Sequence, residues 1–123
     1  MKLFRTEEFV KREIVSPEQV HRKEILTNED QAQELGGLFV VTPPGYKGRG
    51  RGHYHERRES LFMALSGEGS VFIEGEEIPI KAGDILFIPP KVVHTMVNKS
   101  DKDLRFMEFF THPPAKADFH EVD

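Results

Sequence analysis

Gly83-Asp84-Ile85-Leu86-Phe87-Ile88-Pro89-Pro90-Lys91-Val92-Val93-His94-Thr95-Met96-Val97-Asn98 is the stretch of the sequence that decides the fold. It holds two short apolar runs on either side of a Pro-Pro pair, and such β-branched and aromatic runs are typical of strands. A helix through the middle is excluded because proline removes a backbone donor and clashes with the preceding turn. The stretch therefore predicts two short strands joined by a turn.

Similar apolar runs occur on both sides of this stretch. Gly, Pro or Asn separates them, and no long segment has the 3.6-residue period of an amphipathic helix. Short strands with frequent turn signals are typical of an all-β sandwich or barrel. The further predicted strands are residues 38–41, 61–65, 70–73, 78–80 and 104–111.

Three histidines stand at positions that suit a metal site. His53 and His55 are one residue apart, so both imidazoles would lie on the same face of a strand. His94 lies on a predicted neighbouring strand, and Glu59 offers a carboxylate. The chain has no cysteine, so histidine and carboxylate are its strong metal ligands. This combination predicts one bound divalent metal ion.

These residues resemble the two motifs of the cupin family. The first motif combines Gly, His-x-His, Glu and a second Gly, and Gly48, His53, His55 and Glu59 match its elements here. The second combines Gly, Pro, an inner Gly, His and Asn at fixed intervals. Gly83, Pro89, His94 and Asn98 keep those intervals, and Lys91 replaces the inner Gly. The resemblance covers residues 36–111 and implies a single-domain jelly-roll β-sandwich.

The carboxylate position is open between two residues. Seven residues separate Glu59 from Gly67, whereas the family pattern has six, so counting back from Gly67 selects Ser60 instead. A shift of one residue in a strand reverses the face on which a side chain lies. Either a bulge returns Glu59 to the site, or the site consists of three histidines with Ser60 or water beside them. Asn98 could face the same pocket or hold a turn by side-chain hydrogen bonds.

The resemblance implies a metal-dependent function without naming the reaction. Imidazole ligands accept Fe, Mn, Zn, Ni, Cu or Co, and positions left open by the protein would bind water, O₂ or substrate. We expect a small dioxygenase or isomerase that acts on a compact anionic or sugar-like molecule; no residue is assigned a catalytic role. The alternatives are a binding or sensor module without turnover, and a metal-free sandwich whose motif residues serve packing.

Basic residues gather next to the first motif. Five of them lie between Lys47 and Arg58 in a chain of net charge −4. We expect Arg51 and Arg57 to orient an anionic ligand at the pocket mouth, with Asn98 as a further ligand contact. The other reading of this stretch is a solvated, glycine-rich loop.

The whole chain has the size and composition of one soluble domain. Of its 123 residues, 31% are charged and 37% are hydrophobic, and the acidic balance does not favour nucleic acid or a membrane surface as partner. We expect a cytoplasmic protein, because the N-terminus lacks an apolar run. We divide the chain into residues 1–35, which could form a strand or a dimer arm, the cupin domain at 36–111, and a C-terminal tail at 112–123. Unpaired edge strands and surplus apolar faces predict a homodimer.

Overall fold

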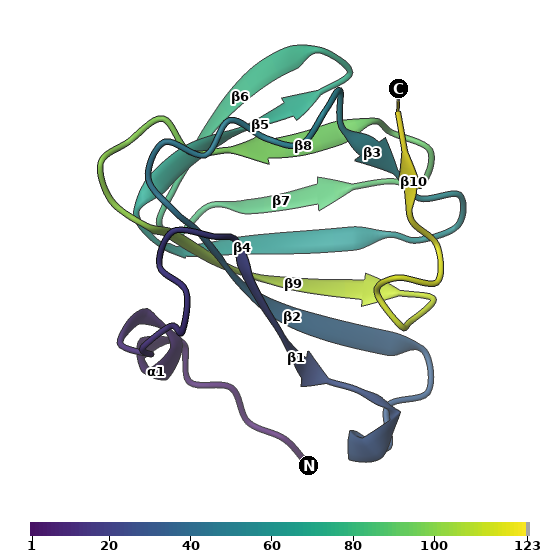
Figure 1. Cartoon of the computed structure of the whole chain (residues 1–123). Coiled ribbons are helices and arrows are strands. Elements are labelled where there is room, and N and C mark those ends of the chain that lie inside the picture. The colour runs from purple at the N-terminus through teal and green to yellow at the C-terminus, as the bar shows by residue number, and fades with distance from the viewer. Residues whose placement is uncertain (123) are drawn as a thin grey trace.

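Two five-stranded antiparallel sheets face each other in the computed structural model, which describes residues 1–122 (Figure 1). The first sheet has the order β1-β2-β9-β4-β7 and the second β10-β3-β8-β5-β6. This is the all-β sandwich predicted from the sequence. The strands of the first sheet are β1 (His21–Leu26), β2 (Leu35–Thr42), β9 (Leu104–Thr111), β4 (Ser60–Ser66) and β7 (Ile85–Ile88). Those of the second are β10 (His120–Glu121), β3 (His53–Tyr54), β8 (His94–Val97), β5 (Glu68–Ile73) and β6 (Glu76–Lys81).

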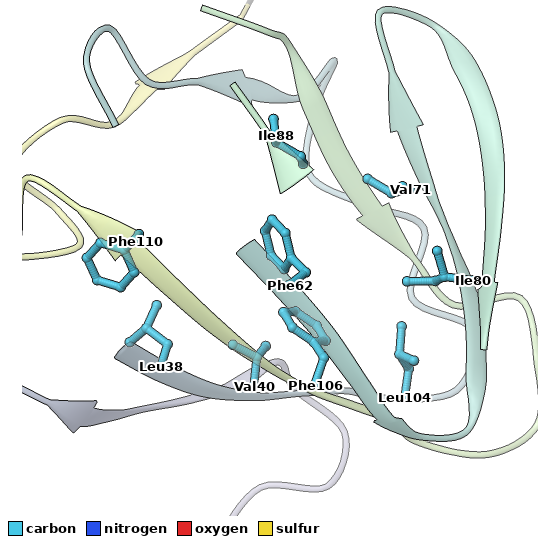
Figure 2. Close-up of a cluster of buried hydrophobic side chains, with 9 residues drawn as sticks. All are labelled: Leu38, Val40, Phe62, Val71, Ile80, Ile88, Leu104, Phe106 and Phe110. Carbon is cyan, nitrogen blue, oxygen red and sulfur yellow. The ribbon is translucent and has the colours of Figure 1, made fainter. Parts of the chain in front are cut away.

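The core lies between the two sheets (Figure 2). Because side chains alternate along a strand, each strand gives every second residue to this interior. In β9, for example, Leu104, Phe106 and Phe110 face inward and are almost fully buried. The cluster consists of Leu38, Val40, Phe62, Val71, Ile80, Ile88, Leu104, Phe106 and Phe110.

The turn between β7 and β8 contains the residue that departs from the cupin motif. Lys91 has a φ of +70°, a left-handed conformation that glycine adopts without steric cost. The backbone therefore keeps the shape that the family's glycine would favour, although this chain has lysine there.

The N-terminal segment belongs to the sandwich of its own chain. Strand β1 pairs with β2, and helix α1 (Thr6–Val10) lies beside the outer face of the first sheet. Phe9 packs against buried Phe39, with ring centroids 5.1 Å apart. A 3-10 turn, η1 (Asn28–Asp30), connects β1 to β2. The sequence predicts more apolar faces than one sandwich interior needs. Helix α1 of the same chain covers part of this surplus, on the outer face of the first sheet.

The other end of that outer face stays exposed. Leu61 pairs with Phe87 across β4 and β7, and the exposed fractions of Leu61, Ile85 and Phe87 are 44%, 60% and 51%. Strand β7 is also one of the two edge strands of its sheet. Within residues 1–122, no helix is long and apolar enough to cross a membrane.

A homodimer through this exposed face remains a prediction. We expect light scattering at micromolar concentration to give twice the 14.1 kDa mass of one chain. The double variant Ile85→Asp/Phe87→Asp should give the mass of one chain, because charge on an apolar contact face opposes its burial. A single-chain mass for the wild type would contradict the prediction.

Candidate metal centre

Three histidines converge inside the sandwich, two from neighbouring strands and one from the residue after β3. His53 of β3 lies directly opposite His94 of β8, and His55 follows two residues after His53. One ring nitrogen of each lies within 4.8 Å of those of the other two. Gly52 allows this approach, because a Cβ at that position would lie only 2.8 Å from the His94 carbonyl oxygen.

The hydrogen bonds of the rings leave nitrogens free for a metal. Nδ1 of His94 donates to the Val92 carbonyl at 2.9 Å, and Nδ1 of His55 donates to the Asp118 carbonyl. Each bond fixes the neutral tautomer whose Nε2 carries a lone pair. Nε2 of His55 is buried and has no hydrogen-bond partner. A buried polar atom without a partner is costly, and a metal ion held by the three imidazoles fits this site.

The protonation state of the site also suits a metal. Burial lowers the pKa of His53 to about 3, and the neighbouring His94 and His55 act in the same direction. Burial also lowers the pKa of His55 and that of His94, although hydrogen bonds to backbone carbonyls oppose this change. The imidazoles are therefore neutral at pH 7, as ligands must be.

The histidines open into a cavity of about 380 Å³ between the sheets. This volume suits a small-molecule ligand. A larger, more open depression of about 530 Å³ over β5 and β6 contains no histidine. The cavity has apolar walls and several charged side chains, which are Arg22, Arg49, Arg58, Glu108 and Lys116.

A buried ion pair lies in the wall of this cavity. Arg58 donates through Nη2 to Oε2 of Glu108, and the exposed fractions of the two side chains are 4% and 7%. Arg58 also donates to the Ser60 hydroxyl at 3.2 Å and to the Ala115 carbonyl at 3.0 Å. Its guanidinium lies over the Phe110 ring at 3.9 Å from the centroid. Arg58 is therefore fully engaged by the protein, and Glu108 is the carboxylate of the cavity.

Glu59 lies outside the cavity lining. It is exposed and its backbone pairs with Thr111, whereas Ser60 is buried and faces Arg58. This is the residue selected by counting back from Gly67. The register of β4 does shift between Ala64 and Ser66, but Glu59 stays exposed. We therefore leave Glu59 out of the proposed ligand set.

The three predicted ligand-contacting residues also lie elsewhere. Arg51 and Arg57 are exposed and do not line the cavity. Asn98 is fully buried and donates to the carbonyls of Thr42 and Lys102, at 2.9 Å and 2.7 Å. Its side chain thus holds the turn after β8, which is the second of the two roles considered for it.

The C-terminal segment runs beside β3, with which β10 pairs (Figure 1). Its residues Ala115, Lys116 and Phe119 line one side of the cavity. The Phe119 ring stacks on His53 with centroids 4.6 Å apart and is itself 39% exposed. The Asp118 carboxylate accepts hydrogen bonds from three consecutive backbone N–H groups after His55. Burial would raise the pKa of Asp118, but these backbone hydrogen bonds outweigh it and lower the pKa to about 2.

Residues 38–110 match the family model described as Cupin domain. The chain is a cupin. Both the family and the sandwich fold predicted from the two motifs are thereby confirmed. Its curated relatives include glucose-6-phosphate isomerase of Pyrococcus horikoshii, which is 29% identical over 95% of this cupin and 67% of the relative. The oxalate-binding protein of Thermotoga maritima is 36% identical over 45% of this cupin and 46% of the relative.

A solved structure supports the fold over the whole chain. A conserved protein with a double-stranded beta-helix domain from Klebsiella pneumoniae matches this cupin with a TM-score of 0.72, at 23% identity, over 99% of both chains. That likeness shows the fold alone. The cupin spans 53% to 67% of the length of the first four glucose-6-phosphate isomerases that it matches.

Sequence reasoning missed several residues of the cavity. Glu108 had a readable signal, because it shares strand parity with the apolar residues Leu104, Phe106 and Phe110. Arg58 is one of the five basic residues predicted beside the first motif, and the register that buries Ser60 also turns Arg58, two residues earlier, inward. Asp118 and Phe119 follow the last predicted strand, and nothing in their spacing connects them to the histidines.

Proposed function

We propose that this cupin is a metal-dependent isomerase of a small, phosphorylated sugar-like molecule. The observation that carries the proposal is the convergence of three neutral imidazoles in a cavity that also holds a buried carboxylate. A divalent metal held by His53, His55 and His94 would polarise a substrate carbonyl. The glucose-6-phosphate isomerase relatives support this reaction class.

Glu108 is the residue that we assign to proton transfer. Isomerisation of an aldose to a ketose moves a proton from the carbon next to the carbonyl to the carbonyl carbon. Arg58 engages Oε2 of Glu108 and fixes the carboxylate in the cavity wall. The other oxygen, Oε1, would accept the proton from one carbon and return it to the neighbouring one.

Basic side chains of the cavity support an anionic group on the substrate. Arg22, Arg49 and Lys116 line the cavity and are exposed at its outer part. They would bind a phosphate at the end of the substrate away from the histidines, which orients the carbonyl end toward them.

Solvent deuterium exchange tests the proposal. Protein purified without a histidine tag is loaded with Fe²⁺, Mn²⁺, Zn²⁺ or Ni²⁺ and incubated with fructose 6-phosphate in D₂O. We expect NMR to show deuterium at the carbon next to the carbonyl, together with aldose product. Glu108→Gln should keep the metal and lose the exchange by about 10²-fold or more, because a positioned acid–base group contributes rate of that order.

A binding module is the second candidate, because the cavity is basic and one relative is an oxalate-binding protein. Thermal stabilisation of the metal-loaded protein by oxalate, without turnover or exchange of any phosphorylated ketose tested, would favour binding over isomerisation.

A further inference from the structure

Asp118 makes an unusual set of contacts for a residue outside both cupin motifs. Its Oδ1 accepts the backbone N–H of Glu56 at 2.8 Å, and its Oδ2 accepts those of Arg57 and Arg58 at 2.8 Å and 3.1 Å. One carboxylate thus satisfies three consecutive donors in the loop that follows His55. Bonds between an ionised carboxylate and backbone N–H groups are stronger than neutral ones, so this loop is firmly held.

The same residue also contacts the His55 ring. The Asp118 backbone carbonyl accepts from Nδ1 of His55, so the ring points Nε2, the buried atom without a partner, toward His53 and His94. The main-chain carbonyl of Asp118 therefore holds the His55 ring. Its side chain holds the loop that follows His55 in the sequence. The two attachments together fix both the position and the tautomer of His55.

We propose that Asp118 is a positioning residue of the metal centre, acting through His55. This inference rests on the proposed metal site at the three histidines. The Asp118 carboxylate fixes residue 118 against the loop, and its carbonyl then keeps His55 in the orientation that binds metal. Without the carboxylate, the ring gains rotational freedom that metal binding must remove.

The test measures metal affinity. Titration with Co²⁺ alone, followed by its visible absorption, should show about 10–100-fold weaker binding for Asp118→Ala, the loss typical when a partner of a metal ligand is removed. Asp118→Asn keeps the size and one acceptor oxygen, and should lose less. The matched control is Glu121→Ala, which changes an exposed carboxylate in the same C-terminal segment as Asp118. This variant loses only the exposed ion pair with Arg49 and should bind Co²⁺ like the wild type.

A double-mutant cycle separates positioning from general stability. In a His55→Ala background, Asp118→Ala should cause no further loss of Co²⁺ affinity, because the ring it orients is gone. An equal loss in both backgrounds, or unchanged affinity of Asp118→Ala and Asp118→Asn with wild-type His55, would overturn the inference and leave the metal site intact. If the wild type itself binds no metal, the proposed function fails as well.

Discussion

Replacing His94 with alanine is expected to remove most of the bound metal. His94 supplies one of three converging ring nitrogens, and its ring is already held by the Val92 carbonyl. Elemental analysis of protein purified without a tag should fall from near one equivalent to about a tenth or less, since affinity depends on the full ligand set. His53→Ala should behave in the same way.

Two variants serve as controls for this loss. Glu59→Gln changes an exposed carboxylate outside the cavity and His112→Ala changes an exposed histidine, so both should retain the metal. Full metal content in both His53→Ala and His94→Ala would disprove the assignment. Loss in Glu59→Gln would mean that Glu59 reaches the metal after all.

Arg58→Met is expected to lower the free energy of unfolding by about 3–5 kcal/mol, because it leaves the Glu108 carboxylate buried without its partner. The variant also removes the bonds to Ser60 and Ala115 and the contact with the Phe110 ring. Urea unfolding of the metal-free protein measures the effect without a contribution from ligand binding.

The double variant Arg58→Met/Glu108→Leu distinguishes a lost partner from lost packing. Replacing both charges by apolar groups removes the uncompensated carboxylate, so most of the stability should return. The control is Lys99→Met at the exposed Lys99–Glu77 pair, where little change is expected. A double variant as unstable as Arg58→Met would show that packing, and not the unpaired charge, causes the loss.

Most of the fold could be predicted from the sequence, because its signals are local. The turn residues around each apolar run, and the fixed intervals from Gly83 through His94 to Asn98, identified the strands and the family. The proximity of His53 and His94 followed from the same motifs. By contrast, no local pattern predicts that residues 120–121 form a strand against β3, or that β1 pairs with β2. Both depend on pairing with another segment of the chain.

Residues of the candidate site could be predicted only where the alternation of side chains along a strand determines which face they lie on. Counting from the histidines selects Glu59 and counting from Gly67 selects Ser60, and in the structure Ser60 is buried whereas Glu59 is exposed. The sequence selects Arg51 and Arg57 by charge alone, and charge does not determine which way a loop residue points. Of the basic side chains that do line the cavity, Arg49 and Arg58 come from the stretch beside the motif, whereas Arg22 and Lys116 come from segments far from it.

The contact between residues 55 and 118 has a consequence for the order of events during synthesis. A chain emerging from the ribosome presents His53 and His55 first and His94 about forty residues later. Asp118, which holds the His55 ring, emerges later still. On the proposed role of Asp118, the three histidines reach the geometry that we expect to bind metal only after residue 118 has joined the fold. We expect a chain truncated before Asp118, with all three histidines present, to offer a metal ion a looser site.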